Sequence, residues 1–347
     1  MTSAEATTSS PAAGQEAWSA SLAECARPSN RLALRDLATS VVPYVALWVA
    51  MYLALDVSYW LVLALSIPAA GFLMRTFIVF HDCTHGSFLP SRQVNNWVGR
   101  FCGVLVFAPF RTWQHEHARH HATAGNLDRR GEGDVPTYTV AEYRAMPWLS
   151  RTGYRLFRNP LIMFTIGPVF AMMISPRFVS REARARMNNS VMLTNLALTV
   201  LVGSFCFLIG WQAFLAVEGP SAVLGGSAGV WLFYVQHQFE DVYWENSGDW
   251  TYDDAALRGS SYLRLPKVLQ FFTGNIGLHH VHHLNARVPN YNLQRAHDEN
   301  PIFDSVPVLT LWDGLRCVRL KLYDEDSARL VGWREVRDWA PAQPEAA

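Results

Sequence analysis

Residues 60–85 read WLVLALSIPAAGFLMRTFIVFHDCTH and join a long apolar run to two histidines. The 21 residues before the histidines contain one charged residue, Arg75. As a helix, a run of this length crosses roughly 30 Å of hydrocarbon. His81 and His85 follow directly and, being four residues apart, would share one face of a continuing helix. The stretch predicts a membrane-spanning helix that ends in a pair of imidazoles.

Three further apolar segments predict three more spans. Residues 37–55 and 191–211 contain no charged residue, and residues 221–236 form a shorter run. We expect an all-α integral membrane protein with four transmembrane helices in two hairpins and a cytoplasmic helical cap. The spans are predicted at about 37–55, 60–80, 191–211 and 221–236. The alternative is a large soluble core with buried helices.

The distribution of basic residues orients the spans. The two predicted outer loops, 56–59 and 212–220, contain no Lys or Arg. Every basic residue outside the spans then lies on one side, which the positive-inside rule makes cytoplasmic. The apolar stretch 161–174 has arginines on both flanks, so we expect it to be interfacial or re-entrant.

Composition excludes several classes of protein. The 347 residues contain 29 Lys and Arg, 29 Asp and Glu, and five cysteines without a paired spacing. The absence of net charge gives no electrostatic reason for nucleic-acid binding, and the cysteines suggest no disulfide framework. Residues 1–30 are predicted to be a disordered tail without a signal sequence, residues 31–325 the membrane domain, and residues 326–347 a C-terminal tail.

The histidines cluster where the spans are predicted to reach the cytoplasmic side. HEHARHH (115–121) and HHVHH (279–283) repeat the helical spacing of HDCTH, and a single histidine follows the fourth span. His115, His280 and His297 do not complete these patterns. The expected metal ligands are His81, His85, His117, His120, His121, His237, His279, His282 and His283.

This number of imidazoles exceeds what one metal ion uses, so we expect two metals with four or five ligands each. The zinc-protease motif HExxH is absent because Arg119 stands where its second histidine would be. The Glu-x-x-His pattern of soluble di-iron bundles is also absent. Iron is the best candidate, because imidazole suits it and oxygen chemistry on an apolar substrate explains a membrane location.

The three motifs HDCTH, HARHH and HHVHH resemble the histidine boxes of the membrane fatty acid desaturase family, in particular the bacterial acyl-lipid desaturases. The resemblance extends to HHATAGNLDRRGEGDV (120–135), QHQFEDVYW (236–244) and the segment 259–293. It covers about residues 35–325. Three residues separate His81 from His85, as in desaturases that act on membrane lipids. His279 stands where front-end desaturases have Gln, so the resemblance is not to the front-end type.

The resemblance implies an oxidoreductase that introduces a cis double bond into the acyl chain of a membrane lipid. It implies two iron ions held by the histidines named above, O₂ as co-substrate, and a bacterial cytoplasmic membrane location with the active site on the cytoplasmic face. In structurally known relatives an Asn lies one turn before the histidine that matches His237, but here that residue is Phe233. His237, the ninth expected ligand, is therefore the weakest part of the match.

Residues beside the boxes are candidates for other roles. Asp82 and Asn275 are candidates to orient imidazoles, and Glu240, Asp241 and Glu245 are either similar groups or a solvated acidic face. A narrow apolar tunnel is expected between the second and fourth spans and the aromatic stretch around Phe271 and Phe272.

Electrons must come from another protein, because the chain has no nicotinamide-binding glycine motif. We expect a ferredoxin or similar carrier to dock near the Arg-rich segment 177–186. Two alternative functions are compatible with the sequence. One is a carotenoid ketolase or hydroxylase with similar boxes, and the other is a histidine-rich metal transporter, which would need ionisable residues inside the spans.

Overall fold

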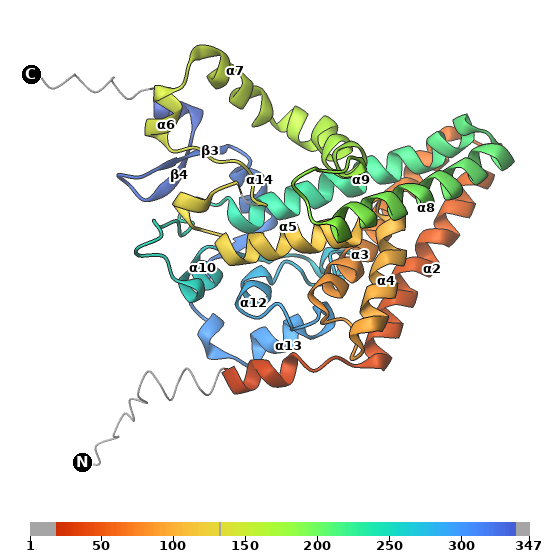
Figure 1. The fold of residues 1–347 in the computed structure, drawn as a ribbon, viewed down its shortest axis with the longest axis horizontal. Helices are drawn as coiled ribbons and strands as arrows, with labels where there is room; N and C mark the ends of the chain where they lie inside the picture. The colour runs from red at the N-terminus through yellow and green to blue at the C-terminus, as the bar shows by residue number, and fades with distance from the viewer. Residues whose placement is uncertain (1–18, 132, 338–347) are drawn as a thin grey trace, which may run out of the picture.

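The computed structural model describes residues 19–337 except residue 132, and these residues are mostly helical (Figure 1). Four helices are long and apolar enough to cross a membrane: α2 (Asn30–Ala54), α3 (Tyr59–His85), α8 (Ala185–Ile209) and α9 (Trp211–His237). They form the two predicted hairpins, α2 with α3 and α8 with α9. The predicted fold class is confirmed, and each helix begins before the apolar run that predicted it.

The predicted outer loop at residues 212–220 is wrong. These residues belong to α9, and the connection from α8 is Gly210 alone, whose φ of 84° turns the chain. Glu218 suggested a loop because carboxylates are rare inside spans. In the structure its carboxylate is buried and accepts hydrogen bonds from the Tyr44 hydroxyl (2.9 Å) and the Trp48 indole (2.9 Å) of α2.

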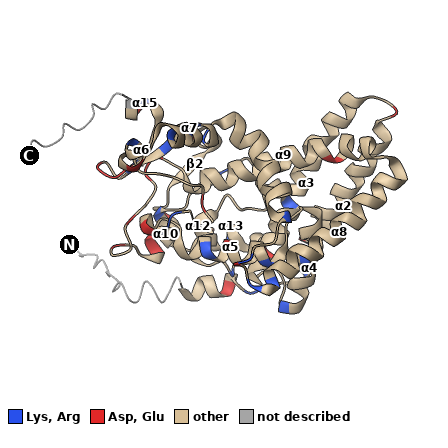
Figure 2. Cartoon of the chain, turned by 45° about the horizontal axis from the view of Figure 1, so that its top comes forward, with Lys and Arg blue, Asp and Glu red and all other residues tan. Residues whose placement is uncertain are grey.

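Helix α3 lies at the centre of the membrane bundle. It packs against α2, α9 and α4 (Arg92–Leu105), and 56% of its most apolar window is buried. The corresponding window of α8 is only 11% buried, so α8 presents most of its surface to the surroundings. Figure 2 shows no basic residue at the ends of the helices farthest from the cap, in agreement with loops that lack Lys and Arg.

The cap consists of short elements at the other end of the four long helices (Figure 1). The α-helices, besides α4, are α5 (Phe110–Thr123), α6 (Val140–Ala145), α7 (Trp148–Phe157), α10 (Tyr252–Arg258), α11 (Lys267–Phe272), α12 (His279–Leu284), α13 (Leu293–Asp298), α14 (Leu311–Cys317) and α15 (Trp333–Arg337). The 3₁₀ helices are η1 (Leu127–Arg129), η4 (Ser175–Arg177), η5 (Asn290–Asn292) and η6 (Pro301–Phe303), and the π-helices are η2 (Ile162–Ile166) and η3 (Val169–Ile174).

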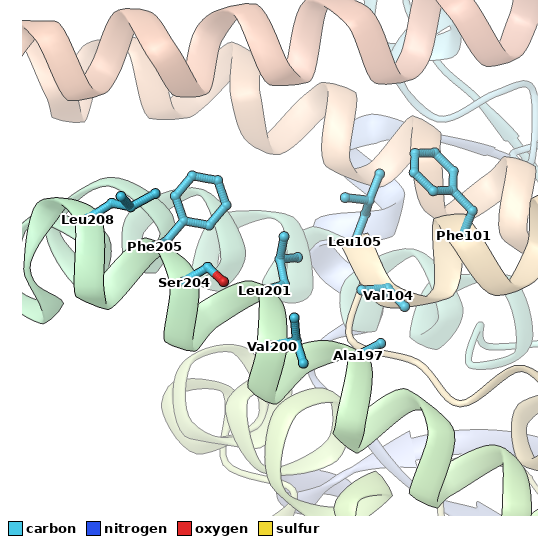
Figure 3. Close-up of a pocket in the computed structure, with 9 residues that line it drawn as sticks. All are labelled: Phe101, Val104, Leu105, Ala197, Val200, Leu201, Ser204, Phe205 and Leu208. Carbon is cyan, nitrogen blue, oxygen red and sulfur yellow. The ribbon is translucent and has the colours of Figure 1, made fainter.

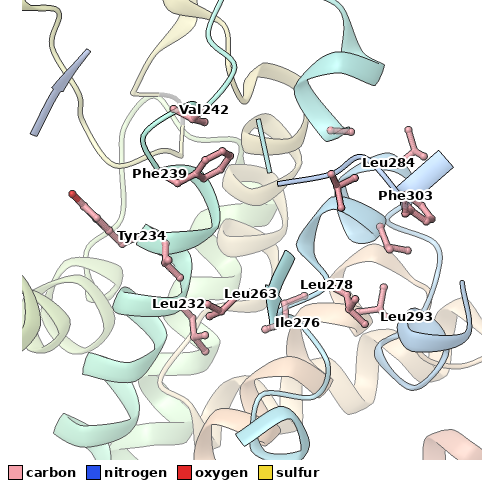
Figure 4. Packing of buried hydrophobic residues seen from close by; sticks show 14 of the residues in the cluster. Leu232, Tyr234, Phe239, Val242, Leu263, Ile276, Leu278, Leu284, Leu293 and Phe303 are labelled. Atoms are coloured by element: carbon pink, nitrogen blue, oxygen red, sulfur yellow. The ribbon is translucent and has the colours of Figure 1, made fainter. Parts of the chain in front are cut away.

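Two small sheets complete the cap. Strand β1 (Tyr262–Arg264) pairs in parallel with β2 (Val308–Thr310), and β3 (Leu320–Asp324) pairs antiparallel with β4 (Arg329–Gly332). The core of the cap joins the C-terminal half of α9 to the segments around α12, and includes Leu232, Tyr234, Leu263 and Leu278 (Figure 4). This packing holds the last turn of α9 beside the HHVHH helix.

The apolar stretch 161–174 lies in a bent segment. Helix α7 and the residues 162–177 meet at an angle of 56°, as in a broken span or a re-entrant loop. The buried guanidinium of Arg158 stands at the bend and donates hydrogen bonds to the Tyr234 hydroxyl (3.1 Å) and the Leu320 carbonyl (3.2 Å). The bend is therefore attached to α9 and β3.

Both predicted tails differ from expectation in their described parts. Residues 19–25 form a helix whose Leu22 and Cys25 are buried in the core of the cap, and Val331 of β4 packs against Tyr143 and Leu322. These few apolar side chains lie within polar sequence, so composition alone did not reveal their contacts. Residues 1–18 and 338–347 lie outside the described part of the chain.

Candidate metal centre

Four segments that are distant in the sequence meet where the long helices enter the cap. The last turns of α3 carry His81 and His85, and α9 ends at His237. The other imidazoles come from α5 and from α12, in which the i, i+3 and i+4 spacing places three histidines on one face. All nine histidines singled out from the sequence lie together here.

The nine imidazoles divide into two groups, each of which can hold a metal ion. The ligand atoms within each group lie within 4.8 Å of one another. The five-histidine group contains His81, His85, His117, His121 and His282, and the four-histidine group contains His120, His237, His279 and His283. Two groups of five and four match the number of ligands expected for two metals.

Neighbouring nitrogens within a group are spaced as ligands of one ion would be. In the five-histidine group the Nε2 atoms of His81 and His117 lie 2.9 Å apart, and those of His121 and His282 lie 2.9 Å apart. In the four-histidine group the His237 Nε2 lies 3.0 Å from that of His279. Two ligands at right angles with metal–nitrogen bonds of about 2.1 Å are about 3 Å apart, so these spacings fit a shared ion.

The charge state of the imidazoles also fits metal binding. Burial, and after it the nearby imidazoles, hold the pKa values of His117, His121, His279, His282 and His283 well below the ordinary value for histidine. These side chains are neutral at pH 7, and neutral imidazole is the form that ligates a metal. The buried Nε2 atoms of His85 and His283 make no hydrogen bond among the described residues, which leaves their lone pairs for a ligand.

Three groups outside the centre contact Nδ1 of a histidine, the ring nitrogen that does not face the other imidazoles. The Asp82 carboxylate lies 2.9 Å from His81 Nδ1, and the Gly259 carbonyl lies 3.0 Å from His237 Nδ1. Asp134 makes a short contact with His120 Nδ1. Such partners fix the tautomer and turn Nε2 toward the metal.

Asp134 was not predicted as a site residue from the sequence. It lies 14 residues after His120, in the loop that follows α5, and burial alone would raise its pKa. The electrostatic interaction and hydrogen bond with His120 outweigh burial and lower the pKa of Asp134. Its only sequence signal was its place at the end of HHATAGNLDRRGEGDV, one of the stretches that carried the family resemblance.

Several other candidates lie away from the imidazoles. Asn275 donates to the Asn290 carbonyl (2.9 Å), and no hydrogen bond joins it directly to a histidine of the two groups in the described part of the chain. His280 pairs with His297 at 3.0 Å, outside both groups, as its failure to complete the spacing suggested.

The acidic run after α9 does not contact the metal centre. Glu240 forms an exposed ion pair with Arg329 (3.2 Å), and the backbone of Glu245 pairs with Gly125 and Leu127. Asp241 is exposed. Of the two interpretations left open for this run, the solvated acidic face is the one that fits.

A cavity of about 800 Å³ extends from the imidazoles into the helix bundle. His81, His117 and His279 lie on its wall. Much of its lining is apolar and comes from α3 and α9, as expected, together with the bent segment around Pro168 and Met172. Its volume lies within the range of sites that enclose a small apolar ligand.

Three aromatic residues considered from the sequence differ in their position relative to the cavity. Phe233 lines the cavity with its ring 5.1 Å from that of His120, so a phenyl group occupies the place for which the resemblance implied an Asn. Phe271 and Phe272 do not line the cavity. They pack instead on Phe72 of α3, and the predicted tunnel wall was wrong at this point.

Comparison with known proteins gives the family. A sequence model of the fatty acid desaturase family matches residues 58–305, more than half of the chain. A fatty acid desaturase of Bacillus subtilis (strain 168) is 47% identical over 316 residues, which cover 91% of this chain and 90% of the relative. An sn-1 acyl-lipid omega-3 desaturase (ferredoxin) of Synechocystis is 32% identical over 63% of this chain and 62% of its own length.

A second Synechocystis relative, an sn-1 oleoyl-lipid 12-desaturase, is 27% identical over 65% of this chain and 64% of its own length. These relatives are desaturases of acyl groups and support that interpretation, not the carotenoid alternative. With four membrane helices, two histidine groups and a cavity that connects them to the bundle, the chain belongs to the fatty acid desaturase family and is an oxidoreductase of the membrane.

Proposed function

We propose that this protein introduces a cis double bond into the acyl chain of a membrane lipid, with O₂ as co-substrate. The observation that supports this most strongly is the position of two adjacent groups of imidazoles on the wall of a largely apolar cavity. Two relatives are named as desaturases of sn-1 acyl lipids, which favours a lipid-bound substrate over a soluble one.

The five-histidine and four-histidine groups would each hold one iron ion. An all-nitrogen donor set suits iron, and the two groups share the helix α5. Bound iron supplies the activation of O₂ that removal of hydrogen from an unactivated methylene requires. The ligands in this proposal are the nine histidines, His237 among them.

The remaining work of the chain is to position the substrate and the ligands. The apolar wall from α3, α9 and the bent segment binds an acyl chain, excludes water and determines which methylene lies beside the imidazoles. Asp82 and Asp134 hold His81 and His120 in one tautomer, with Nε2 directed inward. No carboxylate or nucleophile needs to act on the substrate, because a methylene has no acidic proton to remove.

We assign the cap to the cytoplasmic face of a bacterial membrane. The turns at the far ends of both hairpins, residues 55–58 and Gly210, lack Lys and Arg, and the basic residues outside the spans lie at the cap end. In this proposal residues 31–325 act as one catalytic domain, and the described residues 19–30 and 326–337 pack onto it.

The electron donor in this proposal is a ferredoxin or a similar acidic carrier that docks near residues 177–186. One Synechocystis relative is named as using ferredoxin. Arg181, Arg184 and Arg186 are exposed, whereas Arg177 is half-buried and bonds to Asn195 (3.0 Å). Reversing the charge of Arg181 should slow turnover with reduced ferredoxin and leave the iron content unchanged. Equal turnover would refute docking at this segment.

The function is tested by gas chromatography with mass spectrometry of the fatty acids of a bacterial host that expresses the protein. A new cis-unsaturated acid is expected with the wild type and is expected to disappear in His120→Ala. His297→Ala is the matched control, because this histidine lies outside both groups and should leave the product in place. An unchanged fatty acid profile from iron-loaded, reduced enzyme would contradict the proposal.

A further inference from the structure

A second hollow lies on the outside of the bundle, between α4 and α8 (Figure 3). This groove has a volume of about 630 Å³ and is bounded by side chains such as Phe101 and Leu105 of α4 and Leu201 and Leu208 of α8. The only polar side chain in its lining is that of Ser204. It shares no lining residue with the cavity that reaches the histidines.

The groove is open to the hydrocarbon of the bilayer. Its α8 wall belongs to the candidate span that is least buried within the protein. Phe101 is 54% exposed, Val200 61% and Leu208 74%, although all three are apolar. A surface of this kind at membrane depth contacts lipid chains and not water.

Close packing brings arginines together at the cap end of this groove. A Cβ on Gly99 would lie 2.2 Å from the Phe110 ring, so α4 and α5 cross in direct contact next to Arg100 and Arg111. The Arg111 backbone N–H donates to the hydroxyl of Ser190 (3.0 Å) on α8. Arg186 lies one helical turn before Ser190.

The positive charge of this arginine cluster, which we define as Arg92, Arg100, Arg111 and Arg186, is not compensated by the described part of the protein. The first, second and fourth are exposed, and none of the four forms an ion pair with a described carboxylate. The Arg111 guanidinium donates to the amide oxygen of Gln114 (2.7 Å), a neutral group. Burial, and then the charges of Arg100, Arg186 and Arg92, lower the pKa of Arg111.

The groove and the cluster form one amphiphilic surface. Arg186, Ser190, Ala197 and Leu201 share a face of α8, since their spacing of four, seven and four residues follows the helical repeat. From Ser190 to Leu201 the helix rises about 16 Å, close to half of the roughly 30 Å hydrocarbon thickness. A ligand with an anionic head on the arginines and an acyl chain of one leaflet spans this distance, and its chain would lie in the part of the groove nearest the cluster, from Ala197 to Leu201.

We propose that the groove binds one anionic phospholipid of the surrounding leaflet, with its phosphate on the arginine cluster and an acyl chain along α8. Guanidinium groups bind phosphate by paired, charge-assisted hydrogen bonds, and basic pockets beside transmembrane helices recognise anionic head groups. A zwitterionic lipid carries its own ammonium group and therefore gains less from uncompensated guanidiniums. This site is separate from the catalytic cavity, and its occupant is not the substrate.

Native mass spectrometry of the full chain in detergent tests the proposal. The protein is mixed with equal amounts of phosphatidylglycerol and phosphatidylcholine that carry the same acyl chains. We expect the first retained lipid to be phosphatidylglycerol, with a preference of about tenfold, and we expect this preference to fall below twofold in R92Q/R100Q/R111Q. Arg186 is left intact because it also lies in the proposed docking segment for the electron donor.

The matched control is R258Q/R287Q/R316Q, which removes three exposed arginines far from the groove in sequence and should keep the preference. A197F/S204F fills the groove and should weaken retention of both lipids. If the triple variant does not fold, Arg100→Gln alone should reduce the preference by at least twofold.

Two results would overturn the proposal. The first is equal retention of the two lipids by the wild type, or a preference that survives R92Q/R100Q/R111Q. The second is a wild type without lipid preference together with weaker binding of an acidic ferredoxin by R92Q/R100Q/R111Q than by the wild type. This result would make the cluster a protein-docking surface instead.

Discussion

The carboxylate of Asp82 lies 2.9 Å from Nδ1 of His81, the residue directly before it in the chain. The same carboxylate accepts a hydrogen bond from the backbone N–H of Asn290 (2.6 Å), whose side-chain amide donates to Asp36 (2.9 Å) on α2. Asp36 in turn forms a buried ion pair with Arg75 of α3. One imidazole of the five-histidine group is thus positioned by a network that joins two membrane helices to the cap.

Asp82→Ala should reduce metal binding by the five-histidine group. Loss of the partner on Nδ1 allows the His81 ring to turn, and loss of such a partner typically costs 10- to 100-fold in metal affinity. We expect purified Asp82→Ala to hold about one iron per chain where the wild type holds two, as measured by inductively coupled plasma mass spectrometry. Asp128→Ala removes an exposed carboxylate outside both groups and should not change the iron content.

Asp134→Ala should reduce metal binding by the four-histidine group. Asp134 contacts His120, so the metal held by His120, His237, His279 and His283 is expected to be lost while the ion of the five-histidine group remains. The combination of Asp82→Ala with Asp134→Ala should leave less than half an iron per chain. Two ions retained in Asp134→Ala would show that His120 needs no partner on Nδ1.

Gly226→Leu should change which acyl chains are used. A Cβ at this position would lie 3.1 Å from Pro168 and 3.3 Å from Met172, so a larger side chain must enter the cavity. On the proposed function, the shortened cavity should lower turnover of long chains by about tenfold or more, or move the double bond. A loss of turnover of this size is within the range that small misplacements of a reacting group cause.

The control for the glycine prediction is Gly203→Leu on α8, where a Cβ would meet no atom within 4 Å. Gas chromatography of the products of both variants, with chains of several lengths, gives the comparison. An identical product profile for Gly226→Leu and the wild type would mean that the substrate does not enter this part of the cavity.

The nine clustered histidines could be predicted as metal ligands from the sequence because most of them follow a local helical spacing. Residues at i, i+3 and i+4 share a helix face whatever the tertiary structure. The division into two groups was not predictable, since it depends on how α3, α5, α9 and α12 cross. His120 belongs to one group, whereas its neighbours His117 and His121 on the same helix belong to the other.

The predictions were wrong where a contact with residues distant in the sequence determines the position of a side chain. The charge of Glu218 suggested a loop, but Tyr44 and Trp48 satisfy it within a helix. Phe271 resembled a tunnel residue by composition, but its ring lies 4.1 Å from the guanidinium carbon of Arg75, away from the cavity. Neither contact is visible from residues close by in the sequence.

Glu218→Ala should weaken the contact between α9 and α2. The substitution leaves the buried Tyr44 hydroxyl and Trp48 indole without an acceptor, at a cost of about 1–3 kcal/mol for each donor. We expect the midpoint of thermal unfolding in detergent to fall by several degrees. Glu218→Gln retains an acceptor and should fall less, and Asp56→Ala in the exposed outer turn should leave the midpoint unchanged. Equal midpoints for Glu218→Ala and the wild type would contradict this role.

Lys321 should make the stability of the cap depend on pH. Its buried ammonium group lies beside the carbonyl oxygens of Arg158 (2.8 Å) and Val318 (2.5 Å). Burial, and then the charge of Arg158, lower the pKa of Lys321 to about 7, whereas a lysine in an unfolded chain titrates near 10.4. Between these values the unfolded chain binds a proton that the folded chain does not.

The free energy of unfolding should therefore rise with pH from about 7 to about 10, by at most about 1.4 kcal/mol per pH unit, and this contribution should be flat below pH 7. Lys321→Met removes it, so the difference in thermal midpoint between wild type and variant should grow in favour of the wild type from pH 7 to pH 9. Lys267→Met removes an exposed lysine and should follow the wild-type curve. If the curves of wild type and Lys321→Met run parallel, Lys321 is protonated in the folded protein throughout this range, and its carbonyl partners stabilise the ammonium form more than burial destabilises it.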